Sequence, residues 1–358
     1  MQHLNRLDQN LTPAAPPPRI AQSRFLSLLI ILCLAATCGA QTLTDQVVNC
    51  ANQLRAIVPV ADEFKDQREQ VLSSLNDLEA AARDGHQYLA LYRLQSLWTS
   101  IQPVEYSRSK AAIAKEGLPA FEKSWRRLST ELKSLQASID KSIPPRLPTA
   151  VRGLIQICLT KSQAYYESSR PFGEDVQIRS GLYYMGVASA ELDFASLCLK
   201  QSFAGQPSSP PFHSLGPELQ RLDNSIVELY KQRDAPELVE EFIALSSNME
   251  LANQLERVAR YDGALIAYLD TILKLGLLEV SAPSPDAAVT LGTRLDQIAS
   301  RLGDGSRDNS VGLIYLAMGR QALGRATTGP KAPDNLKKAA VVIDRVLPAY
   351  INTALEMK

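Results

Sequence analysis

The 358-residue chain has no excess of charge of either sign, with 38 Lys and Arg against 38 Asp and Glu. A protein dedicated to nucleic acid normally carries a clear basic excess, so we expect no nucleic-acid partner. Glycine and proline, at 18 and 21 residues, stay close to average usage, which argues against the many tight turns of an all-β protein. Aromatic residues make up only 6% of the chain, but hydrophobic residues make up 45%, enough for a sizeable core.

Common catalytic and metal-binding motifs are also missing. The chain has no H-E-x-x-H, C-x-x-C or G-x-S-x-G pattern. Beyond residue 40 there are two histidines, His86 beside a predicted helix stop and His213 in a Pro-rich stretch, and neither is set in a metal-ligand pattern. The sequence therefore predicts no catalytic residue, no metal ligand and no cofactor, and it leaves the binding residues unknown.

Two serine–lysine pairs, Ser107 with Lys110 and Ser138 with Lys141, have the S-x-x-K spacing that places a lysine one helical turn from a serine nucleophile. The companion S-D-N and K-T-G elements of penicillin-recognising enzymes are absent. We therefore interpret both pairs as chance spacing in a helical chain.

Two loops match a ligand-binding pattern in part. The segment 324–331 resembles a phosphate loop, but Pro330 precedes its lysine and no strand precedes it, so we expect a flexible interhelical loop. The segment 304–310 spaces oxygen-bearing side chains as a calcium loop does, but it lacks the turn glycine and the bidentate Glu. We expect Asn309 or Ser310 to cap the next helix instead.

The first 40 residues are typical of a secretory signal with a long lead-in. Basic residues precede an apolar run, 25–40, that ends in small residues. The run is shorter than the roughly 20 residues that cross a bilayer as a helix, so we expect cleavage near Ala40 and export, most simply to a bacterial periplasm. The alternatives are an uncleaved N-terminal anchor and, less well matched, a lipid anchor on Cys38. No apolar run after Ala40 is long enough to span a membrane.

Three cysteines, Cys50, Cys158 and Cys198, follow the signal. In an antiparallel hairpin turning near residue 172, Cys158 would lie opposite residue 187, ~16 Å from Cys198 and too far for a disulfide. We expect buried core cysteines, with a thiol available for pairing as the alternative.

Apolar residues recur every three or four positions after residue 41, which predicts an all-α fold. The Pro/Ser/Gly-rich stretch 205–216 is the predicted linker between helical-repeat regions 41–204 and 217–358. A capping-box spacing at 234–237 is a helix start signal. Pro103 is expected to end a helix. We expect helices at about 43–58, 60–84, 87–101, 118–141, 149–167, 177–203, 217–233, 236–260, 263–278, 285–302, 311–325 and 334–356.

The segment 118–141 has the most regular pattern, an apolar seam of three heptads from Leu118 to Ile139. We expect a long helix that packs along its neighbours in the same chain. A homodimer that pairs through this seam is the alternative, and the oligomeric state stays open.

The chain also contains internal similarity. The segment 180–192 resembles 310–323, and 82–92 resembles 259–268, in the same order. This order suggests a divergent duplication of roughly 60–233 in 236–358, and such repeats predict stacked helical hairpins that share a core.

Residues 260–275 resemble the second half of a tetratricopeptide repeat, with Ala264 and Tyr268 where that family places a small residue and an aromatic. The preceding helix departs from the pattern, since Ala252 and Ala259 stand where the family usually has Gly. The resemblance covers one unit near 245–278. It implies an irregular α-solenoid of antiparallel hairpins that binds a peptide or protein in a concave groove.

Charge is unevenly distributed along the chain. From 107 to 146 there are nine basic and four acidic residues, and from 236 to 260 five glutamates and two arginines. We expect solvated helix faces, with a basic face for anionic lipid or an acidic partner as the alternative. The tyrosine pairs 165/166 and 183/184 could line a ligand groove, but helical spacing places one of each pair in the core.

These observations predict an exported, non-catalytic module of the bacterial cell envelope that binds a protein or peptide. The alternative is a helical hydrolase or lyase whose carboxylates come from separate helices. An enzyme predicts a compact pocket with several carboxylates of perturbed pKa, whereas a binding module predicts an open apolar or charged groove.

Overall fold

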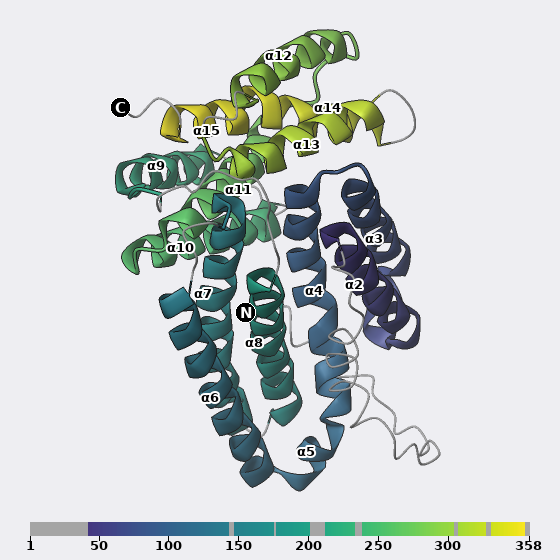
Figure 1. Cartoon of the computed structure of the whole chain (residues 1–358), viewed down its shortest axis with the longest axis vertical. Helices are drawn as coiled ribbons and strands as arrows, with labels where there is room; N and C mark the ends of the chain where they lie inside the picture. The colour runs from purple at the N-terminus through teal and green to yellow at the C-terminus, as the bar shows by residue number, and fades with distance from the viewer. Residues whose placement is uncertain are drawn as a thin grey trace. The chain divides into compact units, whose positions relative to one another are not determined.

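The computed structural model describes residues 42–142, 147–174, 177–200, 212–232, 238–303, 307–326 and 331–354. Every regular element among these residues is a helix, which confirms the all-α prediction (Figure 1). The predicted signal at 1–40 and the capping box at 234–237 lie outside the described residues. In chain order the elements are α2 (Leu43–Ile57), η2 (Val58–Val60), η3 (Asp62–Phe64), α3 (Arg68–Arg83), α4 (Gln87–Ser109), α5 (Ala111–Glu116), α6 (Leu118–Ser142), α7 (Thr149–Glu174), α8 (Ile178–Leu199), α9 (Gly216–Gln232), α10 (Val239–Arg257), α11 (Tyr261–Glu279), α12 (Ala287–Leu302), α13 (Ser310–Arg325), α14 (Ala332–Val341), η5 (Val342–Val346) and α15 (Leu347–Ala354).

Leu43–Lys358 form one unit. Within it, α4, α6, α7 and α8 are long helices that run side by side, and α9 to α15 gather at one end of them (Figure 1). Helix α7 packs on α8 along one side and on α11 along another, so it joins the long helices to the C-terminal group.

The prediction that Pro103 ends a helix is wrong, because α4 continues through Pro103 to Ser109. A proline inside a helix loses a backbone hydrogen bond and crowds the preceding turn. Here Pro103 is buried against α8, where Gly186 is so close that a Cβ on it would lie 3.0 Å from the Pro103 Cα. This packing offsets the cost and cannot be read from the local pattern.

The two turns that precede α4 and α11 have the same geometry. Gly85 has φ of 77°, and the amide of His86 after it donates to the carbonyl of Ala81 at 2.9 Å. Ala259 has φ of 56°, and the amide of Arg260 after it donates to the carbonyl of Leu255, also at 2.9 Å. The internal similarity of the sequence aligns Ala82 with Ala259. In the structure the residue equivalent to Ala259 is Gly85, three positions after Ala82.

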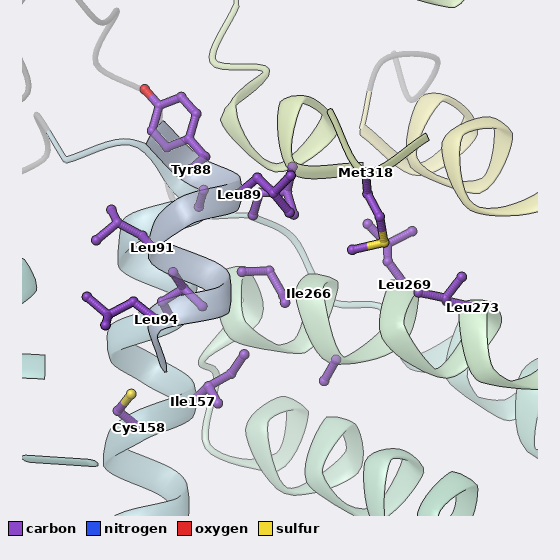
Figure 2. Close-up of a cluster of buried hydrophobic side chains, with 14 of the residues drawn as sticks. Tyr88, Leu89, Leu91, Leu94, Ile157, Cys158, Ile266, Leu269, Leu273 and Met318 are labelled. Carbon is purple, nitrogen blue, oxygen red and sulfur yellow. The ribbon is translucent and has the colours of Figure 1, made fainter. Parts of the chain in front are cut away.

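The hydrophobic core lies where α4, α7, α11 and α13 meet. Figure 2 shows Leu89 on the side of α4 that faces α11, Leu91 and Leu94 on the opposite side of α4, and Met318 of α13 reaching toward Leu269. Each fully buried aliphatic side chain of this kind contributes roughly 1.5–3 kcal/mol by leaving water. The residues labelled in this core are Tyr88, Leu89, Leu91, Leu94, Ile157, Cys158, Ile266, Leu269, Leu273 and Met318.

The central part of the apolar seam of α6 packs within its own chain, while Leu118 at its start is exposed. Phe121, Leu128 and Leu132 are buried against α7 and α8, and Trp125 stacks on Tyr166 with ring centroids 4.5 Å apart. These side chains are therefore not available to pair with a second copy. The outer face of α6 carries the basic residues, and local ion pairs, Arg126–Glu122 and Arg127–Glu131, neutralise part of it.

All three predicted core cysteines, Cys50, Cys158 and Cys198, are buried free thiols. The predicted hairpin register is wrong, because Ser162 Oγ donates to the Ala188 carbonyl at 2.8 Å and Cys158 hydrogen-bonds Glu191 rather than facing residue 187. Helix α7 continues to Glu174, past the expected end at residue 167, which moves the turn.

The predicted linker ends in an anchored segment. Residues 205–211 lie outside the described part of the chain, but the Phe212 amide donates to Asp262 Oδ1 at 3.0 Å. The Leu215 amide donates to Glu256 Oε2 at 3.1 Å. Two acidic side chains at the α10–α11 turn therefore hold the chain that leads into α9.

Candidate functional site

A cleft of about 260 Å³ lies between α4, α7, α10 and α11. We call it the four-helix cleft. Its walls combine apolar side chains with two lysines, a carboxylate and several neutral polar groups. The lining residues are Tyr92, Gln95 and Ser96 from α4, Leu154, Ile157 and Lys161 from α7, Asn248 and Leu251 from α10, and Ala267, Asp270, Leu273 and Lys274 from α11.

Helical spacing explains why these side chains share one cleft. Residues four apart lie one above the other on a helix face. Ile157 and Lys161 on α7 have this spacing, and so do Asp270 and Lys274 on α11. On α7 and α11 the lysine therefore lies one turn further along the same helix face than the apolar residue or the carboxylate.

Asp270 is held by two tyrosines. The hydroxyls of Tyr92 and Tyr315 each donate to its Oδ1 at 2.8 Å. Burial raises the pKa of Asp270, while the two hydrogen bonds, and then Lys274 and Lys161, oppose the rise. The same burial, with the Asp270 charge beside them, raises the pKa of both tyrosines well above the ordinary value, so they remain donors.

Lys161 and Lys274 bring two ammonium groups to the cleft, and both side chains are half-buried. Burial lowers the pKa of Lys274; Asp270 opposes this, and the charge of Lys161 adds to it. Lys274 Nζ donates to the carbonyl of Ala244 at 3.4 Å, a long hydrogen bond. The two lysines therefore repel each other across a space that holds one tyrosine-bound carboxyl.

Another carboxyl, which is fully buried, lies next to the cleft residue Gln95. Glu191 of α8 is 1% exposed, and Gln95, whose side chain lines the cleft, donates to its Oε2 at 3.0 Å. Burial raises the pKa of Glu191, and the opposing influences are Lys161, followed by hydrogen bonds from Cys158 and Gln95. The thiol of Cys158 has a pKa well above its ordinary value because it is buried beside this carboxyl.

An ion pair fixes how α7 crosses α11. Arg152 Nε lies 3.0 Å from Asp262 Oδ2, and both side chains are almost fully buried, at 3% and 1% exposure. Gln156 donates to the same carboxylate at 3.3 Å and accepts from the amide of Gly263 at 2.7 Å. The backbones meet so closely that a Cβ on Gly153 would lie 2.7 Å from the Asp262 carbonyl oxygen. This crossing sets the spacing between the lysines of α7 and α11.

The first turn of α7 is tied to the start of α13. Asp308 Oδ2 accepts from the amide and the hydroxyl of Thr149, at 2.6 and 2.8 Å, and its Oδ1 accepts from the Ser310 amide at 3.0 Å. Asn309 occupies the N-cap position of α13, as expected, but its side chain makes no capping hydrogen bond, and Asp308 accepts from the first-turn amide instead. The Asn309 side chain donates instead to the Leu302 carbonyl.

The two histidines lie apart from the four-helix cleft. His86 lines a smaller cleft of about 180 Å³ together with Arg320. His213 stacks on Phe212, with ring centroids 4.2 Å apart. Neither position brings a carboxylate or thiol together with the imidazole among the described residues.

The serine–lysine spacings form no catalytic pair among the described residues. Ser107 Oγ donates to the carbonyl of Val104 at 3.0 Å, and Lys110 lies over the ring of Tyr106, 5.8 Å from its centroid. In the second pair, 138–141, the lysine side chain lies outside the described residues.

The tyrosine pairs of α7 and α8 pack against each other and line neither cleft. Tyr184 stacks on Phe172 and on Tyr165, with ring centroids 4.9 and 5.9 Å apart, and Tyr183 meets Tyr184 edge-on. Tyr166 is buried. These rings join the two helices near their turn.

Within the described ranges, no group of three or more His, Cys, Asp or Glu side chains is placed to hold a metal ion. Residues 304–306 and 327–330, the centres of the calcium-like and phosphate-like loops, lie outside those ranges. Among the described helices, none has both the length and the apolarity to cross a bilayer.

The sequence analysis missed Lys161, Asp270 and Lys274. The available signal was an Asp and a Lys four apart in 263–278, a stretch that carries no other charged residue. Tyr92, which contacts Asp270 from 178 residues away, has no local signal at all.

Comparison with known proteins adds no relative, since no family model, curated protein or solved structure matches this chain.

Proposed function

We propose that the protein is an exported, non-catalytic binding module of the cell envelope that takes an acidic group of a protein or peptide partner into the four-helix cleft. The observation that carries this proposal is the pair of half-buried lysines, Lys161 and Lys274, facing one cleft. A carboxylate placed between them would relieve their repulsion and would make charge-assisted hydrogen bonds.

The size of the cleft limits what it can take. Its volume of about 260 Å³ lies below the range of about 300–1,000 Å³ typical of sites for drug-sized ligands. One acidic side chain or a chain terminus fits this space better than a whole small molecule does. A peptide that inserts a single acidic anchor is therefore the occupant we favour.

Asp270 does not remove the need for an incoming anion. Its Oδ1 already accepts from Tyr92 and Tyr315, and burial favours its neutral form. A protonated or tyrosine-bound carboxyl neutralises the lysines only in part. The apolar wall, with Leu154 and Leu273 among its residues, would pack against the aliphatic part of the anchor.

The proposal includes an irregular α-solenoid that resembles tetratricopeptide repeats. The support is the pairing of α10 with α11, in which Ala264 is fully buried, and the matching turns at Gly85 and Ala259. Export from the signal-like 1–40 segment belongs to the same proposal, and it is tested by N-terminal sequencing of the protein recovered from its own source.

The binding proposal is tested by selecting displayed random hexapeptides on the immobilised full chain. We expect enrichment of Asp and Glu on the wild type, and its loss on Lys161→Met and Lys274→Met, which keep the aliphatic stem without the charge. Lys231→Met on the exposed face of α9 is the matched control and should select the same peptides as the wild type. No acidic enrichment, or equal enrichment on both cleft variants, would overturn the proposal.

A hydrolase or lyase is the second candidate. It is favoured by the raised pKa of Asp270 and Glu191 and the lowered pKa of Lys274 around one cleft, since such shifts gather at catalytic sites. An enzyme would turn over the acidic peptides recovered by the selection, and Asp270→Asn would abolish turnover. Unchanged peptides after long incubation would exclude this activity.

A further inference from the structure

A second cationic site lies between α3, α4, α13 and α14. Arg325 forms a bidentate pair with Asp77, with Nη1–Oδ2 at 2.7 Å and Nη2–Oδ1 at 2.5 Å. Arg93 Nη1 donates to the backbone carbonyl of Asp77 at 2.9 Å. Lys338 lies close enough for Arg93, Asp77 and Arg325 all to act on its charge. We call these four residues the Asp77 cluster.

The Asp77 cluster holds three cations and one carboxylate. The bidentate bond to Arg325 uses one acceptor position on each oxygen of that carboxylate, and Asp77 also favours the charged form of Lys338. Burial lowers the pKa of Lys338, and the neighbouring Arg93 lowers it further. Arg93 is affected in the same way, by burial and by Arg325. Like charges gathered away from water are costly unless an anion joins them.

The Asp77 cluster also has arginine N–H donors that these hydrogen bonds do not use, and part of it is exposed to solvent. A guanidinium carries five N–H donors. The bonds of Arg93 within the described residues go to Asp77 and Gln321, and those of Arg325 go to Asp77. The Arg325 side chain is 43% exposed, and that of Asp77 is 29% exposed. An anion can therefore approach the cluster from the Arg325 side.

We infer that the Asp77 cluster binds a phosphoryl group, through Lys338 and the spare donors of Arg93 and Arg325. A phosphate monoester carries about −1.5 to −2 charges at pH 7, which matches the excess of positive charge in the cluster, whereas a carboxylate matches only half of it. The planar donor forks of arginine suit phosphate oxygens. None of these four residues lines the four-helix cleft, although Asp270 of that cleft also acts on the charge of Lys338.

The test is isothermal titration calorimetry of the full chain with inorganic phosphate, with chloride at equal ionic strength as the reference. We expect saturable binding of phosphate and none of chloride. Lys338→Met should weaken the binding at least tenfold, without loss of thermal stability, because it removes a buried charge and keeps the stem. Lys337→Met, the neighbouring lysine on α14, is the matched control and should bind as the wild type does.

A second arm distinguishes a soluble phosphate from a lipid headgroup. Co-sedimentation with phosphatidic acid vesicles that is displaced by phosphate and lost in Lys338→Met would support the site with a lipid as its source. Phosphate binding without co-sedimentation would support it with a soluble source. No saturable phosphate binding, or equal binding by Lys338→Met and wild type, would overturn the inference.

Discussion

Tyr92 and Asp270 meet across 178 residues of sequence, with the tyrosine hydroxyl 2.8 Å from the carboxylate Oδ1. Tyr315 donates to the same oxygen at the same distance. One atom thus joins α4, α11 and α13 at the floor of the four-helix cleft. The bond network is at once part of the core and part of the candidate site.

Tyr92→Phe and Tyr315→Phe should each lower the free energy of unfolding by about 1.5–3 kcal/mol, because each removes a hydrogen bond to a half-buried carboxyl. Each should also raise the pKa of Asp270 further, since both bonds favour its ionised form. Urea denaturation and a carboxyl-carbon NMR titration measure the two effects. Tyr230→Phe, at an exposed position on α9, should change neither. A fall in the pKa of Asp270 in either cleft variant would contradict this account.

Asp270 should make stability depend on pH in a defined direction. Its folded-state pKa is raised above the unfolded value near 3.9, so its contribution is fully present below that unfolded value. The contribution is lost as the pH rises through the folded-state pKa. Asp270→Asn cannot titrate, so the variant should gain stability relative to the wild type as the pH rises from about 4. Urea denaturation at several pH values measures this difference. A wild type that gains stability relative to Asp270→Asn as the pH rises would contradict the expected direction.

Removing one partner of the buried ion pair at the α7–α11 crossing should strongly destabilise the protein. Arg152→Met leaves the Asp262 carboxylate buried without its main partner and should lower the free energy of unfolding by about 3–5 kcal/mol. The double variant Arg152→Met with Asp262→Leu should recover a large part of that loss. Denaturant unfolding of both variants makes the comparison. Equal loss in the single and double variants would show that the charges are not coupled.

Local pattern predicted most of the helices because apolar residues recur along them at three- and four-residue spacing; the short α5, which has no buried residue, was not predicted. The local pattern gave wrong predictions where a tertiary contact determines the helix boundary or the register. The burial of Pro103 beside Gly186 keeps α4 continuous, and the extension of α7 changes the register around Cys158. The local pattern could not predict the cleft for a similar reason, since Tyr92, Lys161 and Asp270 come together only where separate helices cross.

Two glycines provide a matched pair. A Cβ on Gly153 would lie 2.7 Å from both the Asp262 carbonyl oxygen and the Ile266 side chain, whereas a Cβ on Gly292 of α12 meets nothing within 4 Å. Gly292→Ala should stabilise the protein by roughly 0.5–1 kcal/mol, because alanine favours a helix interior. Gly153→Ala should destabilise it, because α7 and α11 must separate. Thermal melts of the two variants give the signs, and a stabilising Gly153→Ala would contradict the close crossing.

The most direct measurement is the pKa of Lys274 in the full chain, followed by NMR of ¹³C-methylated lysines with and without saturating glutarate, a small dicarboxylate. Without ligand we expect a value below the ordinary lysine pKa, as burial and Lys161 dictate. Bound glutarate should raise it, because an opposite charge favours the ammonium form, while the neutral analogue glutaramide should leave it unchanged. An unchanged pKa with saturating glutarate would contradict the proposal that this cleft receives an acidic group.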